Sequence, residues 1–146
     1  MTENAELVGV KAGWHIWPVG IIGVLWNGFG CFDFIMTTTR NQAYMAQFPQ
    51  EMQTYWYSMP WWMFGIWAVG VFGALIASLA LLMRSKTAVT LFAAAFVASA
   101  AGFCVGWKNT EAPKVDGMEF MPVVIMAIGF AFTAYAYWQS TRGVLR

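Results

Sequence analysis

Four apolar stretches, each long enough to cross a lipid bilayer, constrain this chain more than any other feature. A transmembrane helix needs about 20 mostly apolar residues to cover about 30 Å of hydrocarbon. The last three stretches contain no Asp, Glu, Lys or Arg, and the first contains only Asp33. We therefore expect an all-α membrane protein, a four-transmembrane-helix bundle. The expected spans are residues 14–36, 61–83, 87–107 and 120–138.

The composition leaves no room for a second kind of domain. Of the 146 residues, 60% are hydrophobic and 10% are charged, whereas soluble domains contain about 25% charged residues. Four spans use about 80 to 90 residues, and the remainder is too short for a soluble core. We expect residues 1–146 to form a single integral-membrane domain. A net charge of +1 argues against an electrostatic surface for nucleic acid.

Basic residues in the short connections predict the orientation. The N-terminal tail carries Glu3 and Glu6 beside Lys11, unlike the basic start of a secretory signal, so the first stretch should be retained as a span. Four spans place both tails and the middle loop on one side. That side carries Lys11, Arg84, Lys86, Arg142 and Arg146, and the other carries Arg40, Lys108 and Lys114. The excess predicts that both termini are cytoplasmic.

The first extracytoplasmic loop has the pattern of a short helix. Its apolar residues recur at spacings of three and four, which is typical of an amphipathic helix. Pro49 suits the first turn of a helix, and Glu51 suits its positive N-terminal dipole. We expect a short interfacial helix lying on the outer membrane surface or folded over the bundle. A simple connector anchored by aromatic side chains is the alternative. The apolar residues are Met45, Phe48, Met52, Tyr55, Trp56 and Met59.

Rows of small residues predict how the helices pack. Such rows let helix backbones approach closely where lipid provides no hydrophobic drive. We expect the third span to be central and its small face to contact the first span. A small face that instead docks another subunit is the alternative. The rows are Gly20, Gly23, Asn27 and Gly30 in the first span, Gly70, Gly73 and Ala77 in the second, and Ala94, Ala98, Gly102 and Gly106 in the third.

Two polar residues of the first span require partners. Asp33 lies near a helix C-terminus, whose partial charge is already negative. Arg40 follows two turns later, and Lys108 lies at comparable depth, so we expect a structural ion pair with one of them; a proton or cation site is the alternative. Asn27 lies deeper, and an interhelical hydrogen bond is its simplest partner.

The sequence carries few groups that suit catalysis or cofactor binding. Cys31 and Cys104 lie at comparable depth, where either a disulfide or two apolar thiols would fit. His15 is the only histidine, so a two-histidine haem site is excluded. We expect His15 to lie at the membrane interface as an amphipathic side chain. The alternative is that His15 binds a porphyrin-type pigment from one face. No nucleophile elbow, phosphate loop or pair of carboxylates is present, and we expect neither an enzyme nor a metal or cofactor site.

One segment resembles a known group of membrane proteins. Residues 25–33 read LWNGFGCFD, followed by Met36-Thr37, Thr39-Arg40-Asn41 and Ala43-Tyr44-Met45. This pattern is similar to small four-span proteobacterial inner-membrane proteins that commonly carry the label "sugar transporter". The resemblance extends through residues 67–84 and covers the rest of the chain loosely. It implies a bacterial inner membrane and solute transport.

The sequence therefore leaves two possible functions open. The first is a non-catalytic accessory or structural subunit that packs against other integral-membrane subunits or against itself, because the chain is small and its loops are minimal. The alternative is a small-solute, sugar-like transporter that works as a homo-oligomer, because four helices are too few to enclose a path. Its candidate solute site comprises Trp26, Asn27, Asp33, Arg40 and Trp67.

Overall fold

The computed structural model describes residues 13–109 and 112–146, and Lys11 lies outside them. These residues form helices and connecting turns. Four of the helices are long and apolar enough to cross a membrane, which confirms the predicted all-α, four-span class. The helices are α1 (Ile16–Thr38), α2 (Gln42–Met45), α3 (Gln50–Ser58), α4 (Trp61–Leu82), α5 (Thr87–Lys108) and α6 (Met121–Thr141).

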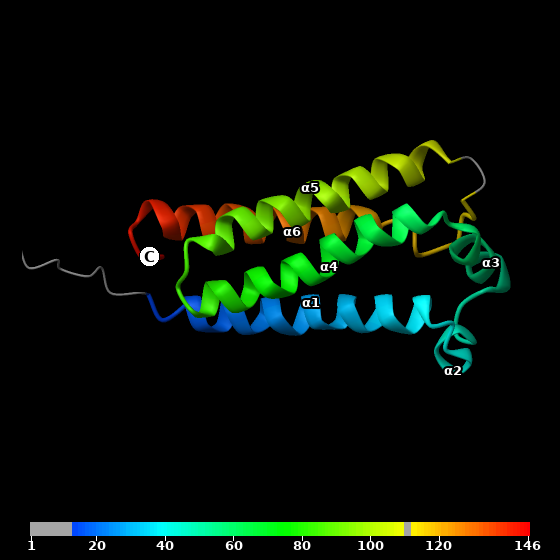
Figure 1. Ribbon diagram of the computed structural model, residues 1–146, viewed down its shortest axis with the longest axis horizontal. Helices are drawn as coiled ribbons and strands as arrows, with labels where there is room; N and C mark the ends of the chain where they lie inside the picture. Colours follow the sequence, from blue (N-terminus) through cyan, green and yellow to red (C-terminus); the bar gives the residue numbers. More distant parts are fainter. Residues whose placement is uncertain (1–12, 110–111) are drawn as a thin grey trace, which may run out of the picture.

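The long helices pack as neighbours in the order α1, α4, α5, α6 (Figure 1). Helix α4 packs extensively against α1 on one side and α5 on the other, and α5 also packs against α6. Helices α1 and α6 share no comparable contact along the described part of the chain. The bundle is therefore open along one side.

Glycines allow the close crossings at both faces of α4. A methyl group added at Gly23 of α1 would lie 2.8 Å from the hydroxyl oxygen of Ser78 on α4. A methyl group added at Gly70 of α4 would lie 2.8 Å from the hydroxyl oxygen of Ser99 on α5. At Gly23 the Phe132 ring and the Ser78 Cβ would also lie within 3.2 Å of the added methyl group, so the crossing of α1 and α4 depends on this glycine. At Gly70 the next atoms are 3.8 Å away, so rotation of the Ser99 hydroxyl would make room for a methyl group.

The packing face of α5 differs from the predicted one. Ala88, Phe92 and Ala95 are the buried residues of α5, whereas Ala94 is exposed. Residues spaced by four drift by about 40° per step around an α-helix, because 3.6 residues complete one turn. A row from Ala94 to Gly106 therefore cannot stay on one face, and the buried residues follow spacings of four and three instead.

The predicted neighbour of α5 is also wrong. A methyl group added at Gly102 would lie 3.6 Å from Ile66 of α4, and one added at Gly106 would lie 3.9 Å from the Tyr55 hydroxyl of α3. Ala98 is half-buried. The connection between α4 and α5 is short, and short connections place consecutive helices side by side. Helix α4, not α1, therefore receives this face.

Three helices end in the same hydrogen-bonded turn. Arg40, Arg84 and Gly143 follow α1, α4 and α6 with positive φ angles of 53°, 59° and 69°. In each turn, the amide of this residue donates to the carbonyl three residues earlier, as from Arg40 to Thr37. The amide of the following residue donates to the carbonyl five residues before it, as from Asn41 to Met36. This pairing satisfies carbonyls that the helix end would otherwise leave open.

The last turn folds the C-terminal segment back onto the bundle. The Arg146 amide donates to the Arg84 carbonyl at 2.7 Å, and the Lys86 amide donates to the Arg146 carbonyl at 2.9 Å. Val144 and Leu145 are consequently buried in the same apolar cluster as Leu81. The most buried core therefore lies at the end of the bundle that carries the C-terminus (Figure 1).

The first loop forms two short helices at the opposite end of the bundle (Figure 1). The predicted apolar stripe is interrupted at Pro49, which caps the N-terminus of α3 and places Glu51 in its first turn. The rings of Phe48 and Trp56 pack edge to face with centroids 5.1 Å apart and join the two pieces. Because α3 has no buried residue, it suits the predicted interfacial position.

Candidate functional site

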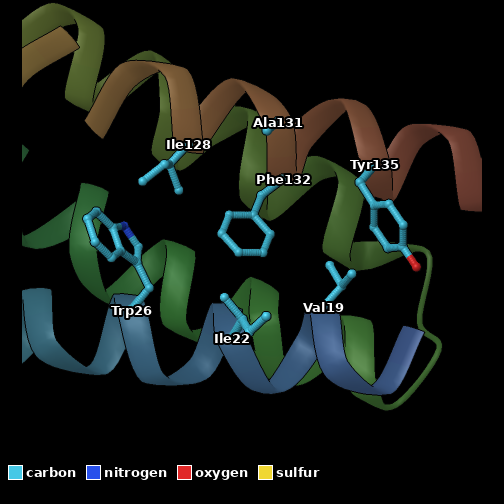
Figure 2. Close-up of a pocket in the computed structure, with 7 residues that line it drawn as sticks. All are labelled: Val19, Ile22, Trp26, Ile128, Ala131, Phe132 and Tyr135. Carbon is cyan, nitrogen blue, oxygen red and sulfur yellow. The ribbon is translucent and has the colours of Figure 1, made fainter. Parts of the chain in front are cut away.

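The open side of the bundle contains a cleft of about 340 Å³ between α1 and α6. Figure 2 shows side chains of the two helices facing one another across it. The lining is apolar except for the tyrosine hydroxyl and the indole nitrogen. The lining residues are Val19, Ile22 and Trp26 of α1, and Ile128, Ala131, Phe132 and Tyr135 of α6.

Phe132 links α6 to the rest of the bundle at the middle of this cleft. Its ring stacks on Phe92 of α5, with centroids 5.5 Å apart and planes 8° from parallel. A methyl group at Gly23 would lie 3.1 Å from the Phe132 ring. The ring therefore reaches across the cleft to the Gly23 position of α1, where there is no side chain in its way.

A polar cluster lies next to Tyr135, where α1 begins. The Tyr135 hydroxyl lies 2.6 Å from His15 Nδ1, and Gln139 Nε2 lies 3.4 Å from the same nitrogen. The Trp138 ring stacks on the imidazole at 5.9 Å. Gln139 is buried, and its Oε1 has no hydrogen-bond partner within residues 13–109 and 112–146. The imidazole therefore links the start of α1 to α6.

Sequence reasoning missed Tyr135 and Gln139. The two side chains are one helical turn apart on α6, and such a pair shares one face. The spacing of four residues between Tyr135 and Gln139 could have indicated a polar face on this helix. The cluster offers hydrogen-bonding groups, but the described residues contain no group of three His, Cys, Asp or Glu side chains that could hold a metal ion.

Asn27 forms the interhelical hydrogen bond that was predicted for it. Its Nδ2 donates to the Ser78 hydroxyl at 3.0 Å and to the Gly23 carbonyl at 2.9 Å. Ser78 in turn donates to the Ala74 carbonyl at 2.8 Å. Both polar groups are therefore engaged in joining α1 to α4.

Asp33 has a different partner from the predicted cation. The Tyr44 hydroxyl of α2 donates to its carboxylate at 2.7 Å. Burial, together with this hydrogen bond and the carboxylate charge, raises the pKa of Tyr44 well above its usual value. The Arg40 guanidinium instead lies 4.6 Å from the centre of the Tyr57 ring, and Lys108 is exposed. The two-turn alignment with Arg40 fails because α1 ends at Thr38.

The five residues of the candidate solute site are not brought together. Trp26 lines the cleft, Asn27 joins two helices, and Asp33 holds α2. Trp67 packs edge to face on Phe34 at 5.1 Å and stacks on Phe64 at 6.4 Å. These side chains serve separate packing contacts along the molecule.

Cys31 and Cys104 are both free thiols, the first buried and the second exposed. The two residues lie on α1 and α5, which do not pack extensively against one another. Comparable depth in the membrane is therefore not enough to bring them together.

No protein-family model, no curated protein sequence and no solved structure matches the chain. What this protein does must be inferred from the cleft and from the contacts of its polar side chains.

Proposed function

We propose that this protein is a non-catalytic subunit that packs against a larger integral-membrane complex. The observation that carries the proposal is the open side of the bundle. Helix α6 buries only Ala136 and Gln139 and makes no extensive contact with α1. A membrane-spanning helix that buries so little of its surface is completed by neighbouring helices or by lipid.

The contacts of the polar residues support a subunit over a transporter. A solute site needs several polar groups that converge on one cavity. Here Asn27 and Asp33 are occupied by Ser78 and Tyr44, and only Trp26 of the candidate set lines the cleft. The aromatic face of Trp26 in the cleft and the resemblance to proteins labelled "sugar transporter" favour the alternative, sugar transport by a homo-oligomer.

Photo-crosslinking from the cleft tests this proposal in the native membrane. A photoreactive amino acid in place of Ile22, which lines the cleft, should give a discrete adduct with a second integral-membrane protein. The same amino acid in place of Ile76 is a matched control, because Ile22 and Ile76 are 59% and 54% exposed and only Ile22 lines the cleft. Adducts would be identified by mass spectrometry after purification in mild detergent.

Three results are distinguishable in this experiment. An adduct from position 22 with one unrelated subunit, absent from position 76, supports the subunit function. An adduct with a second copy of this chain, together with a clean homo-oligomer, favours the transporter. Adducts with lipid alone from both positions would contradict the proposed subunit.

We also propose that the protein lies in a bacterial inner membrane with both termini in the cytoplasm. The resemblance to proteobacterial proteins supports the location, and the excess of Lys and Arg at one end supports the orientation. Among the described residues, that end carries Arg84, Lys86, Arg142 and Arg146, whereas the other carries Arg40, Lys108 and Lys114.

Cysteine labelling tests the orientation without altering the buried C-terminal segment. In a background with Cys31→Ala and Cys104→Ala, a membrane-impermeant maleimide should label Lys114→Cys in intact cells. Arg142→Cys should react only after the membrane is permeabilised. Both positions are exposed, so access to the reagent depends on the side of the membrane. The reverse labelling pattern would overturn the orientation.

A further inference from the structure

The polar cluster beside Tyr135 contains a histidine that bridges two helices at the open side of the bundle. His15 Nδ1 lies 2.6 Å from the Tyr135 hydroxyl oxygen and 3.4 Å from Gln139 Nε2. In the described part of the chain, α1 and α6 share no extensive packing, and Figure 2 shows Tyr135 at the end of the cleft where α1 begins. The imidazole therefore supplies the hydrogen bond between the two helices at that end of the cleft.

The two neighbours indicate which form of the imidazole this arrangement suits. An amide nitrogen donates hydrogen bonds and accepts none, so Gln139 Nε2 requires an unprotonated Nδ1. The Tyr135 hydroxyl then donates to the same nitrogen, and the imidazole hydrogen lies on Nε2. This is the arrangement of the neutral imidazole. Histidine is the side chain that most readily gains a proton between about pH 8 and pH 5.

Gln139 Oε1 is the buried atom that the neutral form leaves unused. Gln139 is 1% exposed, and its Oε1 has no hydrogen-bond partner within residues 13–109 and 112–146. A buried oxygen without a partner costs free energy. A half-turn of the amide exchanges its oxygen and its nitrogen, which would direct Oε1 toward His15 Nδ1. This oxygen is therefore suited to accept a hydrogen bond from a protonated imidazole.

The charged side chains around this cluster are basic. The Arg142 guanidinium lies 4.7 Å from the centre of the Trp138 ring, and the same ring stacks on the His15 imidazole at 5.9 Å. A proton on His15 would therefore add a positive charge next to another cation, which is unfavourable. Among residues 13–109 and 112–146, the other charged side chains at this end of the bundle are Arg84, Lys86 and Arg146.

We propose that His15 is a proton-sensitive switch between α1 and α6. In the neutral form, Nδ1 accepts the hydrogen bond of Tyr135. When a proton from water binds to Nδ1, the imidazole donates to Gln139 Oε1 instead, and the donation from Tyr135 is lost. A short hydrogen bond is thus exchanged for a longer contact and a positive charge is added, so the cleft loosens at this end. Any effect of the switch on a docking subunit rests on the proposed function.

Nitrogen-15 NMR of the purified full chain in detergent micelles tests the exchange of partners. His15 is the only histidine, so labelled histidine gives signals from this residue alone. At about pH 6.5, the ratio of protonated to neutral imidazole should rise about tenfold in Tyr135→Phe, which removes the donor to the neutral form. It should fall about tenfold in Gln139→Leu, which removes the acceptor of the protonated form. Each change corresponds to about one hydrogen bond.

Opposite shifts in the two variants support the switch, because a general change in packing would move the ratio in the same direction in both. Any other pattern would overturn it. Tyr137→Phe is the matched control and should keep the wild-type ratio, because Tyr137 lies on the same helix and is 63% exposed. Melting temperatures at about pH 8 check folding, and Gln139→Met replaces Gln139→Leu if the leucine variant is unfolded.

Spin labels measure the loosening of the cleft in a cysteine-free background. Labels at Trp17→Cys and Tyr137→Cys report on the end that carries His15, and their distance distribution should broaden between about pH 8 and pH 5. Labels at Ile35→Cys and Val123→Cys report on the opposite end and should not respond; all four positions are exposed. Broadening at both ends, or at neither, would contradict the switch. The subunit function fails by a different result, adducts with lipid alone in the photo-crosslinking experiment.

Discussion

Replacing Gly23 with leucine should lower the free energy of unfolding by about 3 kcal/mol. A single methyl group at this position would already lie 2.8 Å from the Ser78 hydroxyl and 3.1 Å from the Phe132 ring. A leucine would separate α1 from α4 and break the hydrogen bond between Asn27 and Ser78. Unfolding in mixed detergent micelles, followed by circular dichroism, measures the change.

Gly28→Leu is the matched control for this prediction. It adds the same side chain to the same helix, but nothing lies within 4 Å of a methyl group placed at Gly28. Its free energy of unfolding should stay within about 0.5 kcal/mol of the wild type. Equal destabilisation by both variants would mean that the loss of glycine, and not the crossing with α4, determines stability.

Leu145→Ala should lower the free energy of unfolding by about 3 kcal/mol, because the removed atoms leave a cavity in a closed cluster. Leu145 is 1% exposed and packs in the cluster that contains Ile16, Leu81 and Ala88. The hydrogen bonds between Arg146, Arg84 and Lys86 hold the segment against the turn between α4 and α5. The same unfolding assay measures the effect.

Leu25→Ala provides the comparison, since Leu25 is 68% exposed and its loss leaves no internal cavity. Its effect should be within about 0.5 kcal/mol. A cost for Leu145→Ala no larger than that for Leu25→Ala would show that the C-terminal segment does not pack on the bundle in solution.

Local chemistry was enough to predict the helices and several of their contacts. The absence of charge over about 20 residues makes a span the only favourable state in lipid. Glycine rows correctly indicated close crossings at Gly23 and Gly70, and the half-buried amide of Asn27 required a partner such as Ser78. These are properties that a helix has before it meets its neighbours.

The candidate sites were much less predictable. Tyr135 contacts His15 from a position 120 residues later in the chain, and Tyr44 reaches Asp33 because α1 ends and the chain reverses. The cleft itself exists because α6 packs on α5 and not on α1. None of these contacts follows from the spacing of residues along one helix.

By itself, the sequence determined that the chain crosses the membrane four times, where the spans lie and which residues are small enough for close packing, because lipid and helix geometry act on each segment alone. Only the tertiary structure decided that α4 separates α1 from α5, that Ala94 is exposed, and that a cleft opens beside α6. Small residues fit against any helix, so the choice among neighbours depends on the short connections and on how all the side chains pack together.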